Sequence, residues 1–171
     1  EAAKQIIADD DRIDQAQYRL EEHALVVIAT QQPMARDMRR IVAAIEIASE
    51  LERIGDYSKG IAKITVRHGD QPLVKPLMDI PQMAEQAINM LGTALDAYVN
   101  EDAAAARKLS NADDTVDDLV SHMRSGLIEM IQSDPSVTSR AVDLLFVTHN
   151  LERIADRTTN IAERVIFIDS G

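Results

Sequence analysis

One helical face in the first half of the chain changes from apolar to acidic along its length. Residues three and four apart in an α-helix are neighbours, and positions 42, 45, 49, 52 and 56 read Val42, Ile45, Ser49, Glu52 and Asp56. One hundred positions later the same spacing reads Val142, Leu145, His149, Glu152 and Asp156. Both faces begin apolar and turn acidic.

Residues that interrupt helices are sparse in this chain. The plausible breaks fall at Pro33, between 68 and 81, at 100–102 and at 133–135. Between them we predict helices at about 2–30, 34–67, 82–99, 103–131 and 137–168. Several are longer than the average globular helix, which favours a bundle of long, nearly antiparallel helices.

The chain contains an internal repeat with an offset of 100 to 103 residues. The segment LERIGD at 51–56 recurs as LERIAD at 151–156. The other repeated segments are 60–62 (GIA) with 160–162 (NIA), and 10–14 (DDRID) with 113–117 (DDTVD). Because their order is preserved, we predict two duplicated helical units, at 1–70 and 71–171, with residues 68–81 as the link.

Composition agrees with an all-α fold and excludes several classes of protein. Apolar residues make up 46% of the 171 residues but aromatic residues only 3%, which favours helix over sheet. The absence of cysteine excludes disulfides, thiolate metal sites and cysteine nucleophiles. A net charge of −11 argues against nucleic acid as a partner. The longest apolar run, residues 24–29, is too short for a membrane span, so we expect no transmembrane segment and no signal peptide.

Four pairs of carboxylates share the spacing of one helical turn. They are Asp10 with Asp14, Glu52 with Asp56, Asp113 with Asp117, and Glu152 with Asp156. Like charges four residues apart destabilise a helix by about 0.2–0.5 kcal/mol, so four such pairs need a neutralising partner. Carboxylate oxygens without thiolates suit hard cations such as Mg²⁺, Mn²⁺, Ca²⁺ or iron. The repetition therefore predicts a cation site in each half.

Other readings of the same residues stay open. The simplest alternative is a structural or interaction bundle without metal. In it the acidic faces are solvated, and Arg53 and Arg153 neutralise neighbouring carboxylates. No histidine follows a glutamate by three residues, so the ligand pattern of ferritin-like di-iron enzymes is absent. His149, three residues before Glu152, has the best position of the four histidines to lie near a metal. No phosphate-binding glycine-rich loop and no activated nucleophile are visible, so we predict no enzyme; a carboxylate-metal hydrolase is the distant third reading.

The chain resembles the PhoU family of phosphate-signalling proteins over nearly its whole length. The resemblance rests on residues 32–39 (QPMARDMR), 50–56 (ELERIGD), 151–156 (LERIAD) and 160–163 (NIAE). It implies two similar antiparallel three-helix bundles in tandem. On this reading the chain, which begins at Glu1 in predicted helix, starts within the second helix of the first bundle, and an apolar face of that bundle is left uncovered.

The resemblance also implies a function that the residues alone do not reach. PhoU-like proteins are cytoplasmic negative regulators of the phosphate-starvation response and act as adaptors between a phosphate-specific ABC transporter ATPase and a sensor histidine kinase. A homodimer is expected, with membranes reached only through these partners. Members bind multinuclear metal clusters, above all iron, with Mg or Mn as alternatives. The implied ligands are Glu52, Asp56, Glu152 and Asp156, faced by Asp10, Asp14, Asp113 and Asp117. Gly60 departs from the family pattern, which has asparagine there as at Asn160, so we expect one polar group of the first site to be missing.

Overall fold

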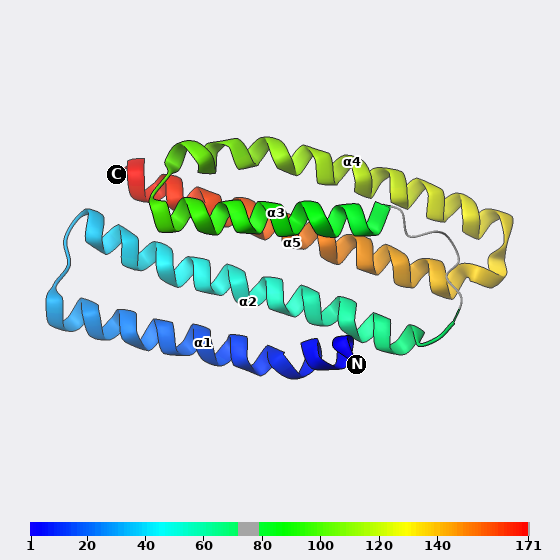
Figure 1. Ribbon diagram of the computed structural model, residues 1–171, viewed down its shortest axis with the longest axis horizontal. Helices are drawn as coiled ribbons and strands as arrows, with labels where there is room; N and C mark the ends of the chain where they lie inside the picture. Colours follow the sequence, from blue (N-terminus) through cyan, green and yellow to red (C-terminus); the bar gives the residue numbers. More distant parts are fainter. Residues whose placement is uncertain (72–78, 171) are drawn as a thin grey trace.

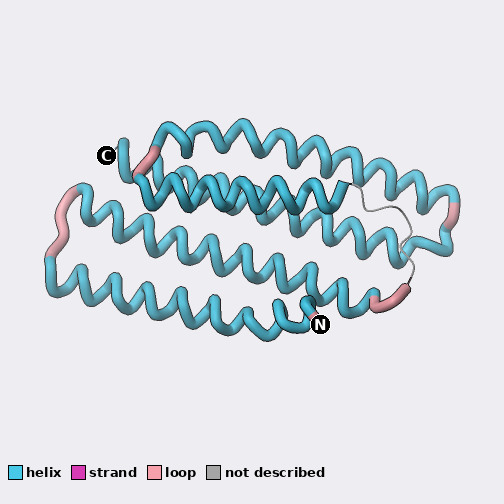
Figure 2. The backbone as a smooth tube through the Cα atoms, in the orientation of Figure 1, coloured by secondary structure: helices cyan, strands magenta, loops and turns pink. Residues whose placement is uncertain are grey.

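Over the residues that the structure describes, the chain forms five long helices (Figure 1, Figure 2). The structure is a computed structural model that describes residues 1–71 and 79–170, apart from the side chains of 110–114. The elements are α1 (Ala2–Gln31), α2 (Arg36–His68), α3 (Asp79–Asn100), α4 (Ala103–Ser133), the 3₁₀ turn η1 (Pro135–Val137) and α5 (Thr138–Ser170). No strand occurs in these described ranges, and the prediction of an all-α helical bundle is confirmed.

Two helices begin more than one residue away from the predicted position. The second begins at Arg36 instead of 34, because Ala35 has a positive φ of 49° that lies outside the helical region. The third begins at Asp79, three residues earlier than predicted, so Pro81 lies in its first turn. A proline is tolerated there because backbone N–H groups in the first turn have no intrahelical acceptor. Much of the predicted 68–81 link lies outside the described residues, and the division into units at 70/71 stays a prediction.

The turn between α3 and α4 is organised by the two residues that make it. Glu101 has a positive φ of 52°, which reverses the chain direction after α3. Asp102 is the N-cap of α4, and its Oδ1 accepts a hydrogen bond of 2.9 Å from the backbone N–H of Ala105. This bond satisfies one of the N–H groups that a helix start leaves without an acceptor.

The main core lies between α3, α4 and α5, and α2 extends it. The buried residues of α3 follow one helical stripe, which consists of Met83, Ala87, Met90, Ala94 and Ala97. Met123 and Leu127 of α4 and Ile161 of α5 are almost wholly buried against it. Ile47 and Ile54 connect α2 to the same core. The four helices α2 to α5 therefore share one continuous apolar interior.

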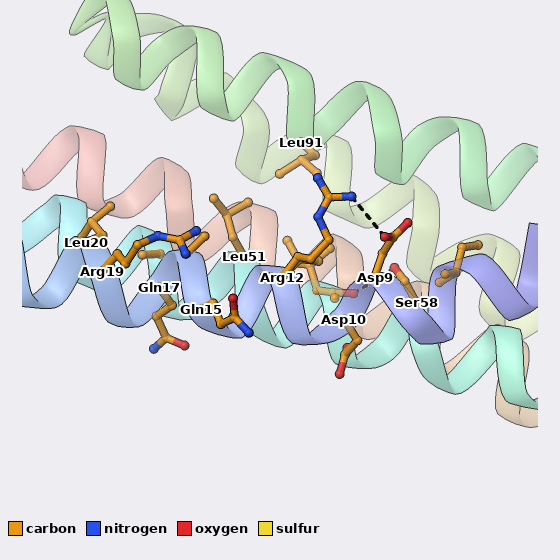
Figure 3. Close-up of a pocket in the computed structure, with 16 residues that line it drawn as sticks. Asp9, Asp10, Arg12, Gln15, Gln17, Arg19, Leu20, Leu51, Ser58 and Leu91 are labelled. Atoms are coloured by element: carbon orange, nitrogen blue, oxygen red, sulfur yellow. Dashed lines mark hydrogen bonds and ion pairs between the residues drawn. The ribbon is translucent and has the colours of Figure 1, made fainter.

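The first helix lies at the edge of the molecule (Figure 1). Among the described residues α1 packs against α2 alone, and only Asp10 and Ala24 of this helix are buried. Leu25 is 64% exposed. An open groove of about 970 Å³ runs between α1 and α2 and reaches Leu91 of α3 (Figure 3). In the described part of the first half, α1 therefore leaves large apolar side chains exposed. None of the described helices combines the length and the apolar content that a membrane span needs.

Candidate metal centre

The antiparallel packing of α1 on α2 brings two carboxylate pairs together. Gly55 lies on α2 between Glu52 and Asp56, and a Cβ atom at this position would be 3.0 Å from Cδ1 of Ile13 on α1. The absence of a side chain at Gly55 thus allows a close approach of the two helices. Ile13 is flanked along α1 by the carboxylates of the 10–14 segment, so these face Glu52 and Asp56 across the contact.

Asp10 is the most enclosed carboxylate of this group. Its side chain is only 4% exposed, and its Oδ2 forms an ion pair with Nζ of Lys59 on α2. A buried charge is costly unless it is paired and hydrogen-bonded. The sequence therefore places a charge in the interior of the α1–α2 contact, where it needs a cationic partner.

The surroundings of Glu52 disfavour the charged form of its carboxylate. Burial raises its pKa above the ordinary value of 4.5, and the negative charges of Asp56 and Asp14 raise it further. Arg53 acts in the opposite direction but is a smaller influence. The group formed by Asp10, Asp14, Glu52 and Asp56, which we name the first acidic cluster, therefore has a surplus of negative charge at neutral pH.

Asp11 belongs beside this cluster although the spacing argument does not include it. One carboxylate oxygen from each of Asp10, Asp11 and Asp14 lies within 4.8 Å of the others. Three oxygen donors at this separation fit a hard cation, and no softer ligand accompanies them. The signal in the sequence was the consecutive run Asp9, Asp10 and Asp11. A search for carboxylates four residues apart does not detect consecutive aspartates.

In the second half the equivalent carboxylates are already paired with an arginine. Nη2 of Arg153 lies 3.0 Å from Oε1 of Glu152, and its Nη1 lies 3.0 Å from Oδ2 of Asp156. Nδ1 of His149 lies 3.5 Å from Oε2 of Glu152, so this histidine is next to the acidic pair. The pairing of Arg153 with its neighbours is the one that the metal-free reading expects.

Of the two predicted partners of Glu152 and Asp156 on α4, the structure describes the side chain of one. Asp117 is exposed on this helix. Asp113 lies outside the described side chains. The convergence of the second group of four carboxylates therefore stays a prediction. In the first group Asp14 and Asp56 act on the charge of Glu52, and Asp10 lies close to Asp14.

Residue 60 faces α5 and not the first acidic cluster. A Cβ atom at Gly60 would lie 2.9 Å from Nδ2 of Asn150 on α5. Its counterpart Asn160 donates a hydrogen bond of 3.1 Å to Oε2 of Glu50 on α2. The interpretation that Gly60 removes a polar group from the first site is therefore wrong, because both positions belong to the contact between α2 and α5. Glu50 also accepts a hydrogen bond of 3.1 Å from Arg53.

The comparison with known proteins agrees with this architecture. The family model described as "PhoU domain" matches residues 1–65 and 80–165. The chain belongs to the PhoU family. A PhoU homolog of Rhizobium meliloti, named as a phosphate-specific transport system accessory protein, is 34% identical over 170 residues, which are 99% of this chain and 72% of the relative. A homolog of the same name from Zymomonas mobilis is 35% identical over 171 residues, with 100% and 72% covered.

Two solved PhoU structures share the fold. The crystal structure of PhoU from Pseudomonas aeruginosa superimposes with a TM-score of 0.94 at 30% identity and covers 99% of this chain and 81% of its own. The phosphate transport system regulatory protein PhoU from Streptococcus pneumoniae gives 0.91 at 27% identity, with 99% and 79% covered. PhoU proteins form a family of accessory and regulatory proteins and are not a known enzyme family.

Proposed function

We propose that this chain is a regulatory accessory protein of a phosphate-specific transport system. The names of its relatives in Rhizobium and Zymomonas support this role. In this proposal it acts in the cytoplasm as a negative regulator of the phosphate-starvation response and connects the ATPase of the phosphate ABC transporter with a sensor histidine kinase. It acts as a homodimer and catalyses no reaction.

The proposal includes metal binding by the acidic residues of both halves. The ligands are Asp10, Asp14, Glu52, Asp56, Asp113, Asp117, Glu152 and Asp156, and the metal is iron in a multinuclear cluster, with Mg²⁺ or Mn²⁺ as alternatives. The observation that carries it is the first acidic cluster, where Glu52 faces Asp14 and Asp56 and its pKa is raised. A cation there would neutralise the surplus charge and favour the ionised form of all four carboxylates.

One observation favours a second candidate, a bundle that binds partners without metal. Arg153 contacts Glu152 and Asp156 at 3.0 Å each, so this pair is neutralised by the chain itself. Metal binding in the second half requires Arg153 to leave at least one carboxylate. The two candidates therefore differ in the number of metal ions that the second half holds.

Elemental analysis of the purified chain tests the metal proposal. The protein is isolated without chelator, and its content of iron, manganese and magnesium is compared with that of Glu52→Ala combined with Asp56→Ala. We expect more than one ion per chain in the unchanged protein and a lower content in the double variant. A matched control replaces Glu85 and Asp118 by Ala, two exposed carboxylates of α3 and α4, and should leave the content unchanged.

Three results would count against metal binding. An unchanged protein without metal, an equal loss in the control variant, or a melting temperature that a chelator does not lower would each favour the metal-free bundle. The chelator acts on stability because a ligand that binds only the folded state stabilises it by mass action.

The regulatory role has a separate test in cells. In a strain that lacks its own copy of this gene, a reporter of the phosphate-starvation response should be active in high phosphate and be silenced when the chain is restored. A reporter that stays silent without the chain would contradict negative regulation, whatever the metal content.

A further inference from the structure

The first acidic cluster contains a cation of its own. Nζ of Lys59 forms an ion pair with Oδ2 of the buried Asp10, and the lysine side chain is 27% exposed. The hydrogen bond to Asp10 raises the pKa of Lys59, and the charges of Asp56 and Asp14 raise it as well. The ammonium group therefore contacts Asp10 and lies within the electrostatic influence of Asp56 and Asp14.

The second half has no lysine at the equivalent position. Residue 159 is a threonine, and its hydroxyl donates a hydrogen bond of 2.8 Å to the backbone carbonyl of Asp156. The acidic pair there is held instead by Arg153, whose counterpart Arg53 is paired with Glu50. Each half thus has a different internal cation, and the one in the first half reaches the cluster from one turn beyond the acidic motif.

The Lys59 ammonium group and a metal ion would compete for the same oxygen atoms. An ammonium group donates hydrogen bonds to the lone pairs that a metal ion would take. Two cations at one carboxylate also repel each other, and the repulsion is screened least where water is excluded, as around Asp10. A metal ion that takes Oδ2 of Asp10 must therefore displace Lys59, which then moves to solvent.

We propose that Lys59 is a built-in counter-ion that occupies the first acidic cluster and lowers its affinity for divalent cations. The inference rests on the proposed metal binding and adds that Lys59 sets the affinity for divalent cations in the first half. Lys59 keeps Asp10 paired when no metal is present. The free energy of metal binding to the first cluster is therefore reduced by the free energy needed to break this ion pair. The two halves differ in affinity because their internal cations differ.

Titration of the metal-free chain with Mn²⁺ tests this role. Mn²⁺ binding is measured by calorimetry for the unchanged protein, for Lys59→Met and for Lys63→Met. Lys63 is the matched control, because it is exposed on α2 one turn further along and its replacement changes the net charge by the same amount. We expect Lys59→Met to bind Mn²⁺ about tenfold more tightly at one site, as removal of a competing charge-assisted hydrogen bond implies. Lys63→Met should stay within about twofold, because the charge it removes is exposed and screened.

Thermal unfolding provides a second measurement that does not require a well-folded metal-free variant. Without metal, Lys59→Met should melt at a lower temperature than the unchanged protein, because Asp10 has lost its partner. Mn²⁺ should raise the melting temperature of Lys59→Met by more than that of the unchanged protein. If Lys59→Met is unfolded without metal, Mn²⁺ should restore its helical circular dichroism. Adding Asp10→Asn to Lys59→Met should remove the gain in affinity, since the competition is for Asp10.

The outcomes separate this inference from the proposed function. Equal or weaker Mn²⁺ binding by Lys59→Met, with binding retained by the unchanged protein, overturns the role of Lys59 and leaves metal binding standing. A gain that persists after Asp10→Asn, or that Lys63→Met reproduces, also overturns it. No binding by any variant overturns both.

Discussion

Replacement of Gly55 by alanine tests the close approach of α1 and α2. Gly55 is a buried glycine within α2, and alanine is favoured over glycine inside a helix by about 1 kcal/mol. The new Cβ would lie 3.0 Å from Cδ1 of Ile13, so this methyl group has to move by a few tenths of an ångström. Ile13 is 38% exposed and its end is free to turn, at an order-of-magnitude cost of about 0.5 kcal/mol for a strained rotamer. We therefore expect Gly55→Ala to stabilise the protein by about 0.5 kcal/mol.

Gly92 of α3 provides the matched control for this measurement. A Cβ atom at Gly92 would have no neighbouring atom within 4 Å, so Gly92→Ala should yield the whole helical preference of about 1 kcal/mol. In thermal unfolding this corresponds to a rise of about 2–4 °C, against about 1–2 °C for Gly55→Ala. Urea unfolding should give the same order with unchanged m-values.

Two results would refute the reasoning about Gly55. If Gly55→Ala stabilises as much as Gly92→Ala, the contact with Ile13 imposes no cost. If it destabilises by more than about 1 kcal/mol, Ile13 is unable to move and α1 is pushed away from α2. Ala155, the counterpart of Gly55, is completely buried, which shows that the second half accommodates a methyl group at this point of the repeat.

Two further predictions concern Glu52 and Asp102. In chelator, Glu52→Gln should stabilise the protein at neutral pH by about 0.2–0.5 kcal/mol, because it removes one of two like charges a helical turn apart. The pKa of Glu52 is raised in the folded state, so the unchanged protein loses stability as the pH rises from 4.5 through that raised value. The advantage of Glu52→Gln should therefore disappear below about pH 4.5 in urea unfolding, and an advantage that persists there would contradict this explanation. Asp102→Ala should destabilise by about 1 kcal/mol because α4 loses its N-cap, whereas Asp102→Asn should retain most of the stability; equal losses in the two variants would exclude capping as the cause.

The sequence predicted the helices well because their boundaries depend on local chemistry. Proline and glycine are rare in the chain, and the ends of all five helices lie within a few residues of the predicted positions. The errors at Arg36 and Asp79 have local causes that spacing does not reveal, which are a positive φ at Ala35 and a proline inside a first turn. Repetition of the acidic motifs also placed the four carboxylates of the first cluster on facing helices.

The partners of these carboxylates were beyond sequence reasoning. A long side chain such as Lys59 reaches a neighbouring helix, and the choice of carboxylate depends on the relative position of α1 and α2. Arg53 and Arg153 occupy equivalent positions in the repeat, yet Arg53 pairs with Glu50 and Arg153 with Glu152 and Asp156. The repeat has Asn150 where Glu50 stands, so equivalent arginines meet different neighbours. Duplicated motifs thus predict equivalent backbone positions and leave the side-chain partners open.

The peripheral position of α1 has a consequence for the dynamics of the first acidic cluster. Within the described part of the chain this helix packs only against α2, and it contributes no residue to the main apolar core. Elements with few buried apolar contacts open by local unfolding at a lower free energy than the rest of a domain. Opening of α1 would separate Asp10 and Asp14 from α2 while leaving the main core intact. If a cation binds between the two helices as proposed, its binding and the order of α1 form one coupled equilibrium, and the bound cation would stabilise the closed position of the helix.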